Sequence, residues 1–559
     1  MALAPRAVDD ASMNALVARA GVKGGGGDLS VAAALAEMER APVAAMPPWR
    51  KLAIFFVMAV GQFMALLDIQ IVVASMSSIQ AGLSASADEI DWIQTAYLMA
   101  EICMIPLSAY LAQALSTRWV FVGSAALFTL TSLLCGAAWD LPSMIAFRAV
   151  QGFVGGAMIP LAFATGFTFF DGAEAATATA VLGVMSTLAP TLGPAIGGWI
   201  TDTLGWRWLF FVNILPGSVV ALSLVGLGRF EKAEPKLLLR IDWLHAASLA
   251  GFLGGLQYVL EEGPRRQWFQ DRGVAALAWI AGVSGVVFFE RCFFSPRPLV
   301  NIAPFRERGF VAASLLSFAI GFGIFTSVYL TPVFLSQVRG FSSIDIGETV
   351  FIAGMFMTLS AAPAAWLAAR VDLRLMMAAG LLFYVISFWM MSSLTADWGF
   401  WELFAPQVIR GVAVLFTMVA VVGMALRDMP DDELKDASGF NNLTRNLGGA
   451  VGIAVVNTWL IDFTQGHAAN LVQGLGRGGA GAQDAFTALV TRFAASGLAP
   501  ARGEGVAAQT VMNGVVGQAL TLAFDDVFRL IAWLFLACLL VVPFCRGGPM
   551  THRERAHHH

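Results

Sequence analysis

The sequence predicts an all-α membrane protein that crosses the bilayer many times. Of its 559 residues, 58% are hydrophobic and only 13% are charged, whereas soluble domains carry roughly 25% charged residues. The apolar residues fall into long runs separated by short polar segments. A bilayer core about 30 Å thick requires about 20 apolar residues in a helix, and lipid offers no partners to an open sheet. We therefore interpret each long run as a membrane-spanning helix.

Fourteen apolar runs have this length, and the basic residues between them indicate their orientation. Most Lys and Arg residues fall on the side of the N-terminus, so the positive-inside rule places both termini in the cytoplasm. The predicted spans are 52–78, 90–113, 118–138, 141–169, 174–201, 207–228, 242–262, 273–293, 309–337, 345–369, 373–394, 400–427, 435–464 and 524–545.

An internal repeat divides these spans into two halves. The stretch "AYLAQALSTRWVFVGSAALF" (109–128) aligns without gaps with "AWLAARVDLRLMMAAGLLFY" (365–384), which places Arg118 on Arg374. Downstream, Arg148 and Arg410 each lie inside a later span of their half. Parallel repeats of six helices are a common transporter plan. We predict six-helix bundles at 49–230 and 305–546, with an inserted helix pair at 241–295.

Three segments lie outside the predicted spans. Residues 1–48 are small, polar and Gly-rich, and we expect a disordered cytoplasmic tail without a cleaved signal peptide. Residues 547–559 form a second cytoplasmic tail that ends in "HHH", the remnant of a tag. Residues 465–522 form a long periplasmic loop with two helix-like stretches, "DAFTALVTRFAASG" and "AAQTVMNGVVGQALTLAFDDVF".

Several motifs resemble those of the major facilitator superfamily, specifically the fourteen-helix drug:proton antiporters of the EmrB/QacA type. They are "LLD" (66–68), "FRAVQGFVGG" in the fourth span, "LAPTLGPAIGGWI" (188–200), "WRWLFFVNILPG" (206–217) and "NNLTRNLGGAVG" (441–452). The resemblance implies the major facilitator fold and a location in the bacterial inner membrane. It also implies proton-driven export of amphipathic drugs or toxic compounds by alternating access, with the proton gradient in place of a cofactor.

The resemblance also implies partners. Pumps of this type in double-membrane bacteria work with a periplasmic adaptor protein and an outer-membrane channel, in a tripartite assembly. Residues 465–522 would dock the adaptor, or alternatively cover the outer vestibule as a lid. Membrane lipids and a small amphipathic substrate are the remaining partners.

The loop between the second and third spans departs from the family pattern. The family carries Gly, Asp and a basic cluster there, whereas this chain has Ala109, Gln113 and only Arg118. The usual charge pair of the cytoplasmic gate therefore cannot form. The basic residues left for the gate loops are Arg118, Arg370 and Arg374.

The fifth span contains an unusual set of helix breakers, namely Pro190, Gly193, Pro194, Gly197 and Gly198. Glycines one turn apart let two helix backbones approach closely, and each proline removes a backbone hydrogen bond and favours a bend. We predict a kinked helix with a flat face, and the resemblance places this face against the thirteenth span at "LGGAVG". The contact is either simple packing or a seam that moves during transport.

Among the ionisable residues inside the predicted spans, we consider Asp68, Glu101, Arg148, Arg410 and Arg445, because burial of a charge requires a partner or a function. We hypothesise that Asp68 and Glu101 bind the coupling proton and that Arg148 tunes them. The alternatives are a fixed Asp68–Arg148 ion pair, a structural Glu101 carboxyl and an Arg148 that caps backbone carbonyls. For Arg410 and Arg445 we expect structural pairing, because neither has an acidic neighbour at helical spacing.

Other function classes lack support in the sequence. There is no phosphate-binding loop, no His/Cys metal spacing and no nucleophile elbow, so we predict a secondary transporter and not an enzyme. The net charge of −4 gives no indication of a nucleic-acid partner. The sequence leaves open a second transport function, the dedicated export of one endogenous lipid-like or siderophore-like metabolite.

Overall fold

The structure, a computed structural model, describes residues 46–550 apart from 87–88, 91, 228–232, 296–297, 342, 428, 431–432 and most of 478–499. All its regular elements are helices, and the described residues contain no strand. The predicted all-α class is therefore confirmed. Most of the predicted tails at 1–48 and 547–559 lies outside the described residues, namely 1–45 and 551–559.

The helices follow the predicted spans closely. The N-terminal half contains α3 (Pro48–Ala74), α4 (Met76–Leu83), α5 (Trp92–Leu115), α6 (Thr117–Gly136), α7 (Leu141–Gly155), α8 (Met158–Phe169), α9 (Gly172–Leu204), α10 (Trp208–Phe211) and α11 (Ile214–Gly226). The inserted pair is α12 (Trp243–Glu262) and α13 (Arg272–Phe294). The C-terminal half contains α14 (Arg308–Gln337), α15 (Ser343–Leu359), α16 (Ala361–Ala368), α17 (Leu373–Met391), α18 (Phe400–Leu426), α19 (Leu434–Arg477) and α21 (Pro500–Cys538). Short 3₁₀ turns lie at η1 (Pro235–Arg240), η2 (Trp268–Gln270), η3 (Ala303–Arg306) and η4 (Val542–Phe544).

Within the described part of the chain, 12 helical segments are both long enough and apolar enough to cross a membrane. Helices α9 and α12 coincide with two further predicted spans but are not among the 12. The protein is thus a polytopic membrane protein, and the count of fourteen spans stays a prediction.

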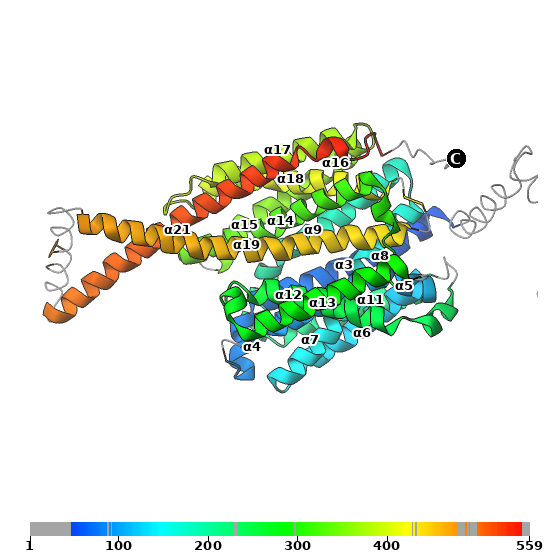
Figure 1. Ribbon diagram of the computed structural model, residues 1–559, viewed down its shortest axis with the longest axis horizontal. Coiled ribbons are helices and arrows are strands. Elements are labelled where there is room, and N and C mark those ends of the chain that lie inside the picture. The colour runs from blue at the N-terminus through cyan, green and yellow to red at the C-terminus, as the bar shows by residue number, and fades with distance from the viewer. Residues whose placement is uncertain are drawn as a thin grey trace, which may run out of the picture.

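The two halves are separate bundles that lie side by side (Figure 1). In the N-terminal half α3 packs on α9, α5 on α7, and α6 on α7 and α11. In the C-terminal half α14 packs on α19, and α17 packs on α18 and α21. Helices α12 and α13 pack on each other, and α12 also contacts α5 and α19. The inserted pair therefore lies beside one of the two seams between the bundles.

Each seam is formed by one long helix of one bundle and several helices of the other. Helix α9 packs on α15, α16 and α18, and α19 packs on α5, α8 and α12. The predicted packing of the fifth span on the thirteenth, α9 on α19, is therefore wrong. The contacts repeat between the halves, because the fifth helix of each bundle packs on the second helix of the opposite bundle.

Helices α19 and α21 are much longer than a bilayer is thick. They contain 44 and 39 residues, which corresponds to roughly 66 Å and 58 Å at 1.5 Å per residue. Figure 1 shows both helices leaving the bundles at the same end. Residues 465–477 and 500–522, which we predicted as parts of a loop, are helical continuations of these two spans. The first predicted loop helix lies almost entirely outside the described residues.

Candidate functional site

A buried ion pair lies at the centre of the N-terminal half. Asp68 belongs to α3 and Arg148 to α7, and neither side chain is exposed to solvent. The Arg148 Nη1 atom donates to the Asp68 Oδ2 atom at 2.5 Å. The structure thus joins two of the three residues that we assigned to proton coupling.

Three neutral side chains complete the surroundings of Asp68. Its Oδ1 atom accepts hydrogen bonds from Asn213 Nδ2 at 2.7 Å and from Gln151 Nε2 at 3.2 Å. Both amide groups also donate to Ser132 Oγ, at 3.0 and 2.8 Å. We call Asp68, Arg148, Gln151, Asn213 and Ser132 the Asp68 cluster. Removing a carboxylate from water costs several kcal/mol unless charge and hydrogen bonds compensate, and this cluster supplies both.

Arg148 also fixes α7 against α5. Its guanidinium carbon lies 4.2 Å from the centroid of the Tyr97 ring, and Nε donates to the Ile93 carbonyl at 3.4 Å. Its Nη2 atom makes no hydrogen bond to the described residues. The close approach of the two helices depends on Gly152, because a Cβ atom there would overlap the Tyr97 carbonyl. This contact explains the glycine in the "FRAVQGFVGG" motif.

Glu101 lies apart from the Asp68 cluster. It follows Tyr97 by one turn of α5, and its side chain is 5% exposed. No hydrogen bond or ion pair joins its carboxylate to the described residues, although the charge of Arg148 acts on it. Helix α5 also packs on α19 of the other bundle. Glu101 is therefore a nearly buried carboxylate on a helix that forms a seam.

The glycines of the fifth-span motif pack against α3, the helix that carries Asp68. A Cβ atom at Gly197 would lie 2.7 Å from the Ile71 carbonyl, and one at Gly193 would overlap Gln70. Gly198 faces open space. Pro190 and Pro194 lie within α9, which runs without a break from Gly172 to Leu204, so the predicted kink stays a prediction.

The same packing recurs in the other half. Cβ atoms at Gly448 and Gly452 of α19 would meet Phe318 and Phe322 of α14. The motif glycines therefore hold the first and fifth helices of each bundle together. The contact of α9 with the opposite bundle uses other positions, such as Gly183, where a Cβ atom would lie 3.0 Å from Leu415 of α18.

Arginines at the predicted cytoplasmic gates cap the ends of helices. Arg118 donates to the carbonyls of Leu224 and Val225 at 3.0 and 2.5 Å, near the end of α11. Arg374 donates to the Cys545 carbonyl at 2.7 Å, just after η4. Arg118 and Arg374 each lie at the second residue of the third helix of their bundle, α6 and α17. These equivalent positions agree with the alignment of 109–128 with 365–384. Arg370 stacks over the Trp366 ring at 4.4 Å.

Two buried arginines of the C-terminal half contact neutral groups. Arg410 of α18 donates to the Ser327 carbonyl and to Thr331 Oγ1, both at 3.2 Å. Arg445 of α19 donates to Asn442 Oδ1 at 2.5 Å and lies 5.7 Å from the centroid of the Phe163 ring, which belongs to the other bundle. The hydrogen bonds of these two arginines to N and O atoms thus go to carbonyl, hydroxyl and amide groups, and their structural role stays a prediction.

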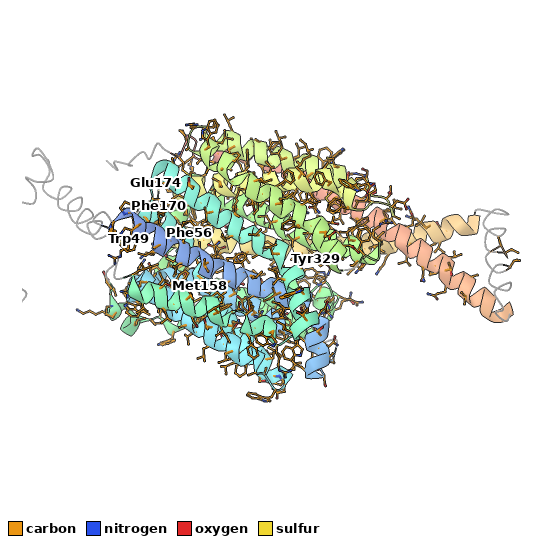
Figure 2. All side chains as sticks on the ribbon, turned by 180° about the vertical axis from the view of Figure 1, so that it is seen from behind. Trp49, Phe56, Met158, Phe170, Glu174 and Tyr329 are labelled. Atoms are coloured by element: carbon orange, nitrogen blue, oxygen red, sulfur yellow. The ribbon has the colours of Figure 1, made fainter. Side chains whose placement is uncertain are left out.

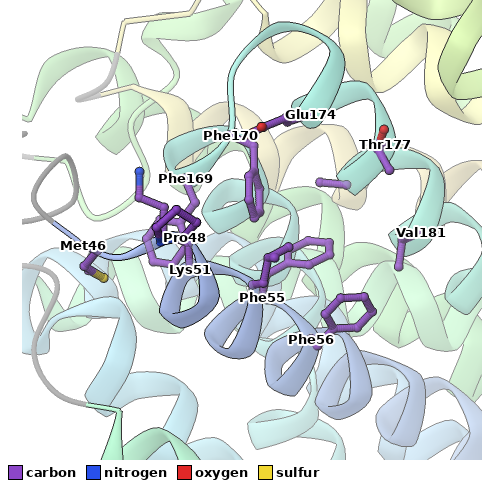
Figure 3. A pocket seen from close by; sticks show the side chains of 12 residues that line it. Met46, Pro48, Lys51, Phe55, Phe56, Phe169, Phe170, Glu174, Thr177 and Val181 are labelled. Carbon is purple, nitrogen blue, oxygen red and sulfur yellow. The ribbon is translucent and has the colours of Figure 1, made fainter.

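An apolar pocket of about 350 Å³ lies between the start of α3, the end of α8 and the start of α9 (Figure 3). The Phe55 and Phe170 rings meet edge to face in it, 5.4 Å apart. Lys51 and Glu174 supply its charged groups. Figure 2 places Phe56, Phe170 and Glu174 near one end of the helices. Asp68 lies 13 residues beyond Phe55 on α3, roughly 20 Å away, so the pocket and the Asp68 cluster are separate sites.

Sequence reasoning missed Asn213, Ser132 and Tyr97. Each is a polar residue inside an apolar run, and that signal could have identified them as partners of a buried charge. The signal could not have shown which charge each of them contacts. Helices α3, α6, α7 and the turn before α11 contribute to the Asp68 cluster, and Tyr97 of α5 packs on its arginine.

Two bundles of membrane-spanning helices with buried charges between their helices are typical of a membrane transporter. A sequence profile of the major facilitator superfamily matches residues 58–453. The colistin resistance protein EmrB of Acinetobacter baumannii is 36% identical over 89% of this chain and 96% of its own. The multidrug export protein EmrB of Escherichia coli K12 is 27% identical over 88% of this chain and 95% of its own. The chain belongs to the major facilitator superfamily, in its EmrB-type branch.

A solved structure shares the fold. The proton:xylose symporter XylE superposes with a TM-score of 0.54 at 12% identity, covering 91% of this chain and 99% of that one.

Proposed function

We propose that this protein exports amphipathic drugs or toxic compounds in exchange for protons, by alternating access between its two bundles. The relatives named for multidrug export and colistin resistance span nearly the whole chain, which supports drug export. The arrangement of two seams, each made by one long helix against the other bundle, is suited to a rocking motion. We further infer an inner-membrane location with both termini in the cytoplasm.

Proton coupling requires a carboxylate that exchanges protons as the seams open. Asp68 is held by Arg148 and two amides, and protonating it would leave the guanidinium buried without a counter-charge. Glu101 has no such partner and lies on a seam helix. We infer that Glu101 carries the proton, and that the Asp68–Arg148 pair sets the electric field in which Glu101 titrates. This unpartnered carboxylate is the observation on which the coupling proposal depends.

The apolar pocket between α3, α8 and α9 supports an amphipathic substrate. Phe56 on its wall is 52% exposed, so the pocket opens to the surface of a predicted membrane span. A molecule in the inner leaflet could place its apolar body on the four phenylalanines, Phe55, Phe56, Phe169 and Phe170, and its polar group near Lys51 or Glu174. We infer that substrates enter here before they reach the seams.

The experiment is a proton-flux measurement. The protein is reconstituted in vesicles that contain a pH-sensitive dye, a proton gradient is imposed, and tetraphenylphosphonium is added. We expect substrate-evoked proton release from the wild type and at least a tenfold smaller signal from Glu101→Gln. The matched control is Glu290→Gln, which removes a half-exposed carboxylate near the end of α13. Proton release by Glu101→Gln at the wild-type rate would contradict this assignment.

Two finer proposals accompany this function. The helical extensions of α19 and α21 would present the docking surface for a periplasmic adaptor, which in turn reaches an outer-membrane channel. Pull-down of such an adaptor by the full chain but not by a chain shortened at both extensions tests this. The second candidate function, export of one endogenous lipid-like or siderophore-like metabolite, is favoured by the aromatic pocket with charged groups of both signs. Tight binding of one extracted metabolite, with no response to drugs, would support it.

A further inference from the structure

Arg148 and Arg410 occupy corresponding places in the two bundles but have different neighbours. Each lies on the fourth helix of its bundle and points to the first, α3 or α14. In the N-terminal bundle the first helix supplies the Asp68 carboxylate. In the C-terminal bundle it supplies the Ser327 carbonyl and the Thr331 hydroxyl, at 3.2 Å each. The Arg410 side chain is 3% exposed and has no carboxylate partner among the described residues.

Two further buried polar side chains lie near Arg410, and the first of them makes no side-chain hydrogen bond to the described residues. Gln407 precedes it by one turn of α18, is completely buried, and neither its Oε1 nor its Nε2 atom makes a hydrogen bond. The hydroxyl of Tyr384, on α17, is likewise completely buried, and the Thr417 hydroxyl of α18 lies beside it.

The register between α17 and α18 places Tyr384 close to Arg410. Ser387 Oγ of α17 donates to the Pro406 carbonyl of α18 at 2.9 Å. Because the two helices are antiparallel, Tyr384, one turn before Ser387, lies level with Arg410, one turn after Pro406. The charge of Arg410 also acts directly on the Tyr384 hydroxyl. The guanidinium, the amide and the hydroxyl therefore belong to one region of the bundle interior.

Among the described residues, this region contains one positive charge without a carboxylate partner and one unpaired amide group. A guanidinium carries five N–H donors and stays charged in proteins. Burying it without a counter-ion costs several kcal/mol, and each unpaired buried donor adds about 1–3 kcal/mol. Water would supply acceptors but no negative charge. The residues are enclosed by the bundle, so a counter-ion from solution must be small.

We propose that Arg410, Gln407, Tyr384 and Thr331 bind a small monovalent inorganic anion, chloride in particular. The bound anion provides in the C-terminal bundle the negative charge that Asp68 provides in the N-terminal bundle. The Arg410 guanidinium, the Gln407 amide N–H and the Tyr384 hydroxyl donate to it. This site is independent of the proton and substrate sites proposed above.

The test is a halide titration of the purified protein at constant ionic strength. Gluconate, a much larger anion than a halide, is replaced stepwise by chloride or bromide while thermal unfolding is recorded. We expect a saturable rise in Tm of at least about 2 °C for the wild type. Arg410→Gln abolishes the rise, whereas Arg445→Gln, which removes the other buried arginine of this bundle, leaves it intact. Tyr384→Phe removes one donor and weakens the apparent halide affinity about tenfold.

A second variant keeps the test decisive if Arg410→Gln fails to fold. Thr331→Asp places a carboxylate where the hydroxyl now meets Arg410 Nη1, and so reproduces the arrangement of Asp68. We expect this variant to be stable without halide and insensitive to it. The proposal would be overturned if the wild type had equal Tm values in gluconate and in chloride. It would also be overturned if the rise in Tm with halide persisted in Arg410→Gln or in Thr331→Asp.

Discussion

Removing one partner of the Asp68–Arg148 pair should lower the free energy of unfolding more than removing both partners. In Asp68→Asn the amide oxygen still accepts from Asn213, but Arg148 keeps a buried charge without a counter-charge. Breaking a buried ion pair in this way costs about 3–5 kcal/mol. In Arg148→Gln the carboxylate retains its two amide donors at 2.7 and 3.2 Å, so we expect a loss of about 3 kcal/mol, at the lower end of that range.

The double variant Asp68→Asn/Arg148→Gln contains no buried charge at this place. Its cost reduces to imperfect hydrogen bonds, about 1–2 kcal/mol. The interaction free energy from the double-mutant cycle should therefore be at least about 3 kcal/mol.

The cycle is measured from denaturant titrations in mixed micelles, followed by tryptophan fluorescence. A matched control is the pair Glu262–Arg266, joined at 2.8 Å with Arg266 34% exposed. Solvent screens such a pair, so its interaction free energy should stay below about 1 kcal/mol. An Asp68–Arg148 interaction as small as that of the control would refute the view that the two charges stabilise each other, and would favour a freely titrating Asp68.

Two further substitutions test the packing and the predicted cytoplasmic end. Gly197→Ala should destabilise the protein by about 1–3 kcal/mol, because the new methyl group meets the α3 backbone. Gly198 faces open space, so Gly198→Ala should stabilise the protein by about 0.5–1 kcal/mol. Equal Tm values for the two variants would contradict the close contact of Gly197 with α3. Arg427 binds the carbonyls of residues 547–549 at 2.9–3.1 Å, so Arg427→Ala should accelerate tryptic cleavage after Arg546. Arg370→Ala, which removes only a stacking contact, is the control, and an unchanged cleavage rate in Arg427→Ala would show that Arg427 does not hold this segment.

The sequence determined the class, the order of the helices and the correspondence between the two halves. Spans of about 20 apolar residues are required by the thickness of the bilayer, and the motifs identify the family. The match of Arg118 with Arg374 also needed only an alignment. Both residues donate to backbone carbonyls near the end of their own half, Arg118 in α11 and Arg374 just after η4.

Only the tertiary structure decided which helix faces meet. Lipid and protein interior are similarly apolar, so a membrane helix shows little of the amphipathic pattern that reveals the buried face of a soluble helix. For this reason the glycines of α9 could not be assigned to α3 from the sequence, and the contact with α19 was predicted wrongly. The same reason concealed Asn213 and Ser132 as partners of Asp68, because hydrogen bonds between distant helices follow from packing and not from spacing along the chain.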